Sequence, residues 1–261
     1  MFRKRFYYLI KVQYLGYRFH GWQKQPKVKT LQLMIERTLN YILEKQAFKI
    51  LAAGRTDAMV SANEAAFELF LEEQPLEDLE AFLELFNHNL PQDIRALDIQ
   101  VVDEKFNIIN HSKTKEYIYL FTEGQKNHPF CAHMISTILD PLDIELMKQG
   151  ATLFQGLHNF KTYCYKPSEN GVFEREIELC ELVENELFTA NFFPETSYML
   201  RVRGKGFGRN QIRLMMGALI KLGRGEISLE YIRQSLLSES TEVMDYIAPA
   251  SGLMLNKIEF D

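Results

Sequence analysis

Stretches of alternating hydrophobic and polar residues run through the first half of the chain, separated by stretches in which hydrophobic residues recur with helical spacing. Alternation predicts strands, which are expected at residues 6–14, 48–52, 66–71 and 94–102. Helical spacing follows Thr30, a residue type that caps helices, and a second helix is predicted from Pro75, because proline suits a first helical turn. The predicted element order of this half is βαββαβ.

The same order recurs in the second half of the chain. Strands are expected at 114–122, 175–184, 198–203 and 253–260, and helices at 144–154, at 209–222 and after Ser228. Two successive split-βαβ units predict an α+β fold with two antiparallel sheets backed by helices. We expect an N-terminal half, 1–105, and a C-terminal half, 106–261, packed around a central cleft because no low-complexity linker separates them.

Composition narrows the class of protein. A chain of 261 residues with 46% hydrophobic content can bury a sizeable core. Its three cysteines, Cys131, Cys164 and Cys180, are odd in number and widely spaced, which argues against a disulfide framework and a zinc site. The chain has no apolar stretch long enough to span a bilayer. Lys11 interrupts the first apolar run, which argues against a signal peptide. We expect a soluble cytoplasmic protein without a membrane partner.

Charge is distributed unevenly along the chain, although the formal net charge is only −5. Residues 1–62 carry 12 Lys/Arg against 3 Asp/Glu, residues 63–110 carry 2 against 12, and residues 201–225 carry 7 basic residues and no acidic one. Two basic segments on an acidic body predict a focused site for a polyanion such as RNA. The alternative is that solvated charged faces segregate by chance.

The loop Ala53–Ala58 is the strongest candidate for catalysis. A short apolar run leads into it, and it places one carboxylate, Asp57, two residues from a guanidinium, Arg55. Gly54 gives the loop backbone freedom, and the side chains of Thr56 and Asp57 can close a turn. An Asp beside an Arg stays ionised. This carboxylate can serve as a nucleophile, as a base, or as half of an ion pair.

A second candidate segment, 204–209, alternates glycines with basic and aromatic residues before a predicted helix. Its three glycines would let backbone N–H groups approach an anion, and the helix N-terminus would favour negative charge. Arg209 and Arg213 are four residues apart, which places them on one face of that helix. The glycine spacing fits neither a Walker loop nor a dinucleotide fingerprint. We therefore predict a basic surface rich in backbone donors.

These motifs occur together in one known family. The matching stretches are Tyr14–Pro26, Thr30–Gln32, Ala53–Ala58, Asn89–Ile94, Lys115–Tyr119, Gly156–Phe160, Phe207–Arg213, Gly223–Gly225 and Ala248–Leu253. In this order the chain resembles the tRNA pseudouridine synthase A family over nearly its whole length. The resemblance implies the pseudouridine synthase fold, with two ferredoxin-like halves, and usually a homodimer. It also implies isomerisation of uridine to pseudouridine in RNA, without cofactor or metal.

The resemblance also implies site roles, residue by residue. Asp57 matches the catalytic aspartate, and Arg55 would help to hold the flipped-out nucleotide. Tyr117 would stack on the target uracil. Arg213 matches the arginine that pairs with the aspartate and keeps it charged. Weaker RNA-contact candidates are Trp22, Lys205 and Arg209. The expected substrate region is the anticodon arm of tRNA.

Each assignment has a structural alternative. Asp57 could be only a turn residue, Tyr117 ordinary strand core, and Arg213 a coat on the helix surface. Trp22, the only tryptophan, could anchor the core, and His158 is expected to be structural because the chemistry needs no histidine.

Some positions depart from the family pattern. After Asp57-Ala58 the family continues Gly-Val-His-Ala, whereas this chain has Met59-Val60-Ser61-Ala62, and the family's Phe-His-Ala-Arg appears as Phe106-Asn107-Ile108-Ile109. We expect these changes to affect contacts with RNA, while the catalytic aspartate is kept. They favour an active synthase with a shifted RNA substrate. A catalytically silent RNA-binding protein of the same fold is the alternative. An interaction protein without an RNA role is disfavoured by the basic segments.

Overall fold

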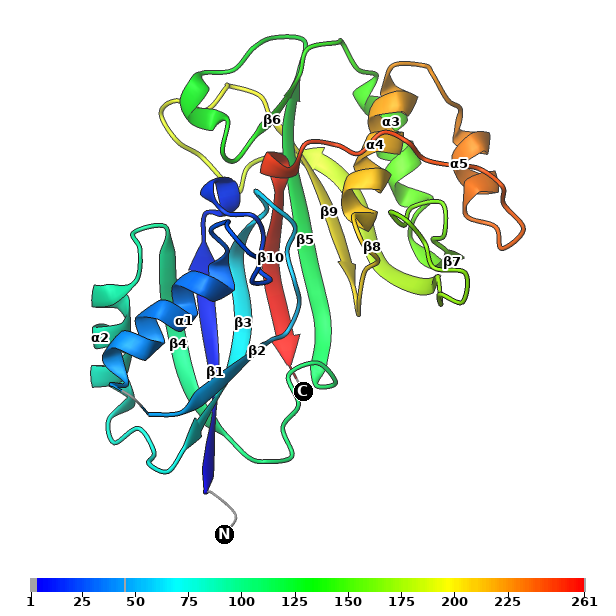
Figure 1. Ribbon diagram of the computed structural model, residues 1–261. Helices are drawn as coiled ribbons and strands as arrows, with labels where there is room; N and C mark the ends of the chain where they lie inside the picture. The colour runs from blue at the N-terminus through cyan, green and yellow to red at the C-terminus, as the bar shows by residue number, and fades with distance from the viewer. Residues whose placement is uncertain (1–3, 45, 261) are drawn as a thin grey trace. The chain divides into compact units, whose positions relative to one another are not determined.

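The computed structural model describes residues 4–44 and 46–260, which form two compact units (Figure 1). Unit 1 contains the described residues up to Lys113 and those from Leu255 onward, and unit 2 contains Thr114–Met254. The contacts divide the chain after Lys113, whereas the expected halves meet at 105/106, and in addition the end of the chain joins unit 1.

Unit 1 has the predicted order βαββαβ. Its elements are β1 (Arg5–Tyr14), α1 (Leu31–Ile42), β2 (Phe48–Ala52), β3 (Ser61–Glu72), α2 (Leu79–Asn89) and β4 (Ile94–Val102), with a 3-10 turn at Gly16–Arg18. The strands follow the order β4-β1-β3-β10, where β10 is Leu253–Phe260, and β2 also pairs with β3. Strand β1 is antiparallel to both neighbours, so Ile10 lies opposite Phe67 on one side and Ile99 on the other.

The core of unit 1 forms between the sheet and α1, which crosses in front of it in Figure 1. Alternate residues of β1 are buried, and so are Leu31, Ile35 and Leu39, which recur along one side of α1. The Thr30 hydroxyl caps this helix by accepting a hydrogen bond from the Leu33 amide at 3.3 Å, as predicted. Hydrophobic periodicity therefore identified both surfaces of this core.

The described strands of unit 2 follow the order β5-β9-β8-β7 in the same sheet as those of unit 1, so the expected two separate sheets are one sheet in this structure. The strands of unit 2 are β5 (Ser112–Glu123), β6 (Ser136–Ile138), β7 (Gly156–Asn159), β8 (Glu174–Glu184) and β9 (Tyr198–Gly204). Its helices are α3 (Ile144–Thr152), α4 (Gln211–Gly223) and α5 (Leu229–Ser235), with 3-10 turns at Pro129–Cys131 and Ala250–Gly252. The pairs β5/β9, β9/β8 and β8/β7 are antiparallel, whereas β6 runs parallel to β5.

The three helices of unit 2 pack closely at a glycine. A Cβ on Gly150 of α3 would overlap the end of the Leu222 side chain and touch that of Ile232, so a side chain at this position would force these residues of α4 and α5 to shift. Ser228 caps α5 as predicted, accepting a hydrogen bond from the Tyr231 amide at 3.2 Å.

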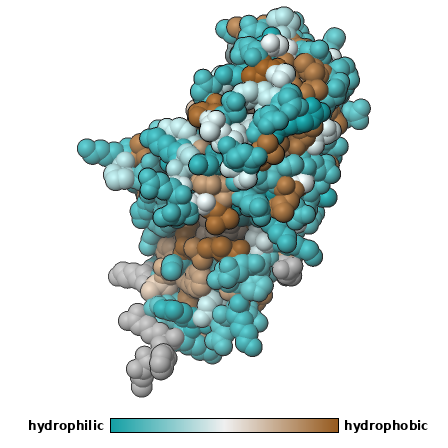
Figure 2. Space-filling model, turned by 90° about the vertical axis from the view of Figure 1, so that its right-hand side faces the viewer, coloured by the Kyte–Doolittle hydropathy of each residue, from teal (hydrophilic) through white to brown (hydrophobic). Residues whose placement is uncertain are grey.

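Several predicted boundaries are wrong. Helix α2 begins at Leu79 with Asp78 as its cap, four residues after Pro75. Helix α4 begins at Gln211 rather than Arg209. The short strands β6 and β7 were not predicted, because three or four residues show too little periodicity. No helix among the described residues is long and apolar enough to cross a membrane. Figure 2 shows a face on which hydrophobic patches alternate with hydrophilic side chains.

Candidate active site

The loop that carries Asp57 joins β2 to β3 in unit 1. The Ala53 amide still bonds the Ala66 carbonyl at 3.0 Å, and beyond it the chain leaves the sheet. Thr56 is buried, whereas Arg55 is exposed and Asp57 half-buried. Thr56 therefore anchors the loop in the core, and its two neighbours in the sequence, Arg55 and Asp57, are more exposed.

Thr56 is held by both its side chain and its carbonyl. Its hydroxyl forms a buried 2.9 Å hydrogen bond with the Tyr14 hydroxyl, and its carbonyl accepts from the Trp22 amide at 3.0 Å. Buried polar groups that are fully paired fix local geometry. From the sequence, Tyr14 was assigned only to a strand face. Its contact with Thr56 could not be found from periodicity, because it spans 42 positions.

Two glycines let the segment 14–22 approach the loop closely. Gly21 has φ +81°, and a Cβ there would lie 2.7 Å from the Thr56 carbonyl oxygen. A Cβ on Gly16 would overlap the Val60 carbonyl. The Gly16 amide instead donates to the Ser61 hydroxyl at 2.9 Å. Ser61 stands where the resembled family has histidine. It is buried, and its hydrogen bond joins the segment 14–22 to the end of the Asp57 loop.

Met59 keeps an unusual backbone conformation in this loop. Its φ is +66°, in the left-handed region that glycine adopts freely. Its amide donates to the Phe19 carbonyl at 3.0 Å, and the Val60 amide closes the turn on the Asp57 carbonyl at 3.2 Å. The loop therefore retains at residue 59 a conformation suited to glycine, although methionine replaces it.

The carboxylate of Asp57 does not close this turn. Within the described part of unit 1 it accepts no hydrogen bond and forms no ion pair, including none with Arg55. Among the described residues of unit 1, Asp57 therefore takes part in the turn through its carbonyl, whereas neither a turn closed by its side chain nor a local ion pair with Arg55 is formed. The Asp57 carboxylate is half-buried, and the backbone that carries it is held in place by hydrogen bonds. Because its oxygens accept no hydrogen bond from the described residues of unit 1, they are available for a ligand.

Trp22 lies in the core of unit 1. It is 3% exposed, and its ring centroid lies 6.2 Å from that of Tyr14 and 6.3 Å from that of Phe67. This placement agrees with the core alternative, in which the indole supports the segment that holds Thr56. It does not support the expectation that Trp22 offers a surface for RNA.

In unit 2, Tyr117 differs from its neighbours on β5. Tyr119 is fully buried, and its hydroxyl donates to the Pro249 carbonyl at 2.8 Å and is hydrogen-bonded to the Ser136 hydroxyl at 2.9 Å. Tyr117 is only half-buried, and its ring meets the edge of Phe207 with centroids 5.3 Å apart. Phe207 belongs to the glycine-rich segment, so this contact links two predicted site elements. Tyr117 is therefore not ordinary strand core.

Arg213 is fixed in the first turn of α4. Its Nε donates to the Ala248 carbonyl at 2.7 Å and its Nη1 to the Asn210 side chain at 3.3 Å. The Ala248 amide returns a hydrogen bond to the Arg213 carbonyl at 3.1 Å. The side chain is half-buried and held at a defined place, unlike a flexible surface arginine. Because Asp57 and Arg213 belong to different units, their pairing stays a prediction.

The glycine-rich segment differs from its predicted form. Gly204 lies in β9 opposite Lys115 and Ile177, and the Gly208 amide donates to the side chain of Gln211 at 2.7 Å. These glycines therefore do not form the predicted row of amides directed at an anion. Arg209 precedes the helix, so it does not share a helical face with Arg213. Its guanidinium instead lies 5.0 Å above the Tyr165 ring.

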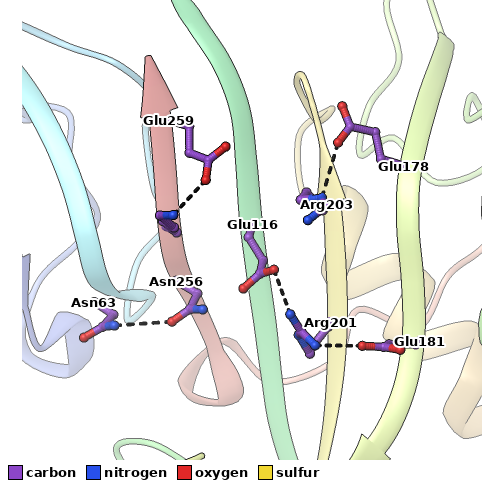
Figure 3. A network of polar contacts seen from close by, with 9 residues as sticks. Asn63, Glu116, Glu178, Glu181, Arg201, Arg203, Asn256 and Glu259 are labelled. Atoms are coloured by element: carbon purple, nitrogen blue, oxygen red, sulfur yellow. Dashed lines mark hydrogen bonds and ion pairs between the residues drawn. The ribbon is translucent and has the colours of Figure 1, made fainter. Parts of the chain in front are cut away.

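Carboxylates neutralise much of the basic segment 201–225. Arg201 bridges Glu116 and Glu181 at 3.1 and 2.8 Å, and Arg203 pairs with Glu178 at 3.3 Å (Figure 3). Lys221 and Arg224 pair with Asp245 and Asp140, both at 2.6 Å. Lys205 and Arg209 form no ion pair with a carboxylate in the part of the chain that the structure describes. These two cations remain available to an outside anion.

Unit 1 shows the same neutralisation. Lys11 pairs with Glu64 at 3.0 Å and Arg18 with Asp93 at 2.7 Å. The basic segment 1–62 and the acidic segment 63–110 thus supply partners to each other, in the case of Lys11 and Glu64 across the paired strands β1 and β3. Charge counted along the sequence overstates the free positive charge of the folded unit.

His158 makes a local side-chain contact in the structure. His158 lies on β7, where its Nε2 is 2.9 Å from the Gln155 carbonyl. This local contact agrees with the structural role expected for it. No group of three or more His, Cys, Asp or Glu side chains placed to hold a metal ion was found within residues 4–44 and 46–260.

Comparison with known proteins gives one consistent result. Residues 10–108 and 151–261 match the family model described as tRNA pseudouridine synthase. The chain is 28% identical over 252 residues to tRNA pseudouridine synthase A of Dictyoglomus thermophilum, covering 96% of this chain and 98% of that protein. It is 30% identical over 254 residues to tRNA pseudouridine synthase A 2 of Bacillus cereus strain ZK / E33L, covering 97% and 99%. A Geobacillus relative is 28% identical, covering 96% of each chain.

Proposed function

The chain belongs to the tRNA pseudouridine synthase family, and from this premise we propose that Asp57 is the carboxylate with which it isomerises uridine to pseudouridine in tRNA. In this reaction the N1–C1′ bond breaks and a C5–C1′ bond forms, while C5 loses a hydrogen and N1 gains one. No atom is added or removed overall. The target base must leave its stack to reach the catalytic group.

The observation that carries the assignment is the state of the Asp57 loop. Its backbone is held in place through Thr56, while the Asp57 carboxylate has no partner among the described residues of its own unit. An ionised carboxylate can add to the sugar or the base, or remove a proton from the sugar, and each of these steps needs free oxygens. Arg55, exposed beside it, is suited to contact a phosphate or a base of the extruded nucleotide.

Unit 2 supplies the remaining roles in this proposal. Tyr117 stacks on the target uracil, with Phe207 supporting its ring from the side. Arg213 pairs with Asp57 and keeps it ionised. The hydrogen bonds from Arg213 to Ala248 and Asn210 favour this role, because a pre-positioned guanidinium loses less freedom on pairing.

Other features follow the family premise. We propose that each half has the ferredoxin-like arrangement, which the βαββαβ order of unit 1 supports. We also propose a homodimer, a cytoplasmic location where tRNA is found, and the anticodon arm as the modified region. The catalytically silent alternative rests on the strained conformation of Met59, and the experiment below separates it from an active enzyme.

The test is pseudouridine formation in tRNA transcripts by the purified wild type and by Asp57→Asn. Wild type should form pseudouridine, and Asp57→Asn should abolish turnover while retaining tRNA affinity and thermal stability. Asp103→Asn is the matched control, because Asp103 only accepts the Lys105 and Phe106 amides through Oδ1, a bond that asparagine can also make. Activity in Asp57→Asn would remove the assignment, and an inactive wild type that binds tRNA would favour the silent alternative.

A further inference from the structure

Unit 2 contains a cavity of about 500 Å³ that the assignments above do not use. It lies between the segment 161–167, helix α4 and the strap, defined here as residues 240–249, which form neither helix nor strand and run orange to red in Figure 1. Its floor is apolar, with Leu214 and Met244 buried in it. Small-molecule sites in proteins occupy roughly 300–1,000 Å³. The cavity therefore has the size and lining of a ligand site.

The strap that closes one side of this cavity is fastened to the rest of the unit. The Thr162 hydroxyl donates to the Glu242 carbonyl at 3.1 Å, and the Ala248 amide bonds Arg213 on α4. A Cβ on Gly217 would overlap the Tyr246 carbonyl, so the strap and α4 are in direct backbone contact. The cavity is thus a built feature bounded by fixed segments.

Positive charge without a carboxylate partner surrounds the cavity. Lys161 and Lys166 line it and are exposed, and neither forms an ion pair within the described residues. Tyr165, also in the lining, carries Lys166 Nζ at 5.4 Å and the Arg209 guanidinium at 5.0 Å from its ring centroid. Two cations therefore lie over the Tyr165 ring, and Lys161 is a third cation in the lining.

The two acidic residues of the lining are already engaged. Asp245 pairs with Lys221 at 2.6 Å, which lowers the pKa of its carboxyl. The Glu242 carboxylate accepts a hydrogen bond from the Tyr231 hydroxyl. Glu242 keeps its negative charge, so Lys161 and Lys166, with Arg209 nearby, stand against this one carboxylate, and the balance of charge around the cavity is positive. An apolar chamber with cations at its edge complements a nucleotide, whose base is flat and largely apolar and whose phosphates are anionic.

We propose that this cavity is a subsite for one nucleobase of the bound tRNA, with the flanking phosphates held by Lys161, Lys166 and Arg209. The inference rests on the proposed function, because it takes tRNA as the ligand. The base is not the one that is isomerised, since the subsite contains none of the residues assigned to the chemistry. It holds a second nucleotide of the substrate and contributes affinity and register.

The chain carries its own probe of this subsite. Cys164 lines the cavity and is half-buried, whereas Cys131 and Cys180 are buried, and burial raises the pKa of both thiols. Because the thiolate is the reactive form, N-ethylmaleimide should modify Cys164 first. Saturating tRNA should slow this modification of the Asp57→Asn protein at least about tenfold, measured by mass spectrometry. Polyphosphate, an anion without bases, should protect much less.

A kinetic test complements the labelling. Tyr165→Ala removes the aromatic ring that lines the cavity and lies against the Arg209 guanidinium. This variant should raise KM for tRNA about tenfold with little change in kcat. Tyr165→Phe keeps the ring and should restore KM to within about twofold of wild type. Tyr41→Ala removes an exposed tyrosine from α1 and serves as the control.

The outcomes are distinguishable. Unchanged labelling of Cys164 in the tRNA complex, equal protection by polyphosphate, or an unchanged KM for Tyr165→Ala overturns the subsite while leaving the proposed function intact. A wild-type protein that forms no pseudouridine overturns the function, but the labelling still reports whether a base occupies the cavity. Absence of any tRNA binding overturns both.

Discussion

Met59 occupies a left-handed backbone conformation. This conformation lowers the free energy of unfolding of a protein when the residue that adopts it has a Cβ. Met59→Gly should therefore raise the free energy of unfolding by about 0.5–1 kcal/mol, after the added freedom of glycine in the unfolded chain is subtracted. Urea denaturation measures this difference. Met59→Ala is the matched control, since it removes the side chain but keeps the strain. A destabilised Met59→Gly would show that methionine contributes contacts that outweigh the strain.

Glu68 is a second residue under strain, of an electrostatic kind. It is 1% exposed on β3, burial raises the pKa of its carboxyl, and its Oε1 has no hydrogen-bond partner. The Ile108 amide, at 3.4 Å, and the charges of His111 and Lys49 oppose this shift only in part. A raised carboxyl pKa means that the folded state binds a proton more tightly than the unfolded chain. Stability is therefore gained as the pH falls through the folded-state pKa and lost above it.

Glu68→Gln removes this buried charge. The variant should be more stable than wild type at pH 7.5, and the advantage should shrink toward pH 4.5, the usual carboxyl range. Thermal melts across this pH range measure the effect, with the exposed Glu104→Gln as control. Equal stability of both proteins at every pH would contradict the charged state assigned to Glu68.

At the scale of these residues, sequence reasoning found the catalytic loop but not what holds it. Asp57 and Arg55 were identifiable because they are adjacent in a motif. The contacts of Thr56 with Tyr14 and Trp22, and the fit of Gly21, depend on segments that meet only in the folded unit. The nearest local sign was the excess of glycine and aromatic residues in 14–22.

At the scale of elements, periodicity located the helices and misplaced some of their ends. Proline at residue 75 suggested a start, but the side chain of Asp78 supplies the hydrogen bond that begins α2, accepting from the Ala81 amide at 3.0 Å. At α4, Asn210 precedes the helix at φ +57° without a side-chain cap, which is why the predicted start at Arg209 was wrong. A cap is a three-dimensional contact, and composition alone offers several candidates.

Asp78→Ala should consequently destabilise the protein by about 1 kcal/mol, because the α2 N-terminus loses its hydrogen bond and a favourable charge near the helix dipole. Chemical denaturation of the purified protein checks this value. Glu77→Ala, one residue earlier and exposed, should change stability by less than about 0.5 kcal/mol. Similar losses in the two variants would mean that general charge, not the cap, stabilises this end.

At the scale of the whole molecule, folding changes what the charge pattern means. Most of the basic side chains around Arg201 pair with carboxylates, so the sequence overestimated the free charge, whereas Lys205 and Arg209 stay unpaired in the described residues. The double variant Lys205→Ala/Arg209→Ala should reduce the slope of log affinity for tRNA against log salt by about 1.5–2 units, if each cation contacts one phosphate.

Arg201→Ala is the control for that measurement. Arg201 belongs to the same segment but already bridges Glu116 and Glu181, so its loss should change the slope by less than about half a unit. A slope that depends on Arg201 as strongly as on the other two cations would indicate that net charge, rather than individual unpaired side chains, governs RNA binding.

Because β10 belongs mostly to unit 1, the order in which the ribosome synthesises the chain decides when the sheet of unit 1 is completed. Strand β10 is translated only after nearly all of unit 2, so the emerging unit 1 leaves the part of the β3 edge that β1 and β2 do not cover unpaired until then. An open edge invites pairing with other chains, and a nascent chain stalled before residue 255 would expose that edge beside the aspartate-bearing loop.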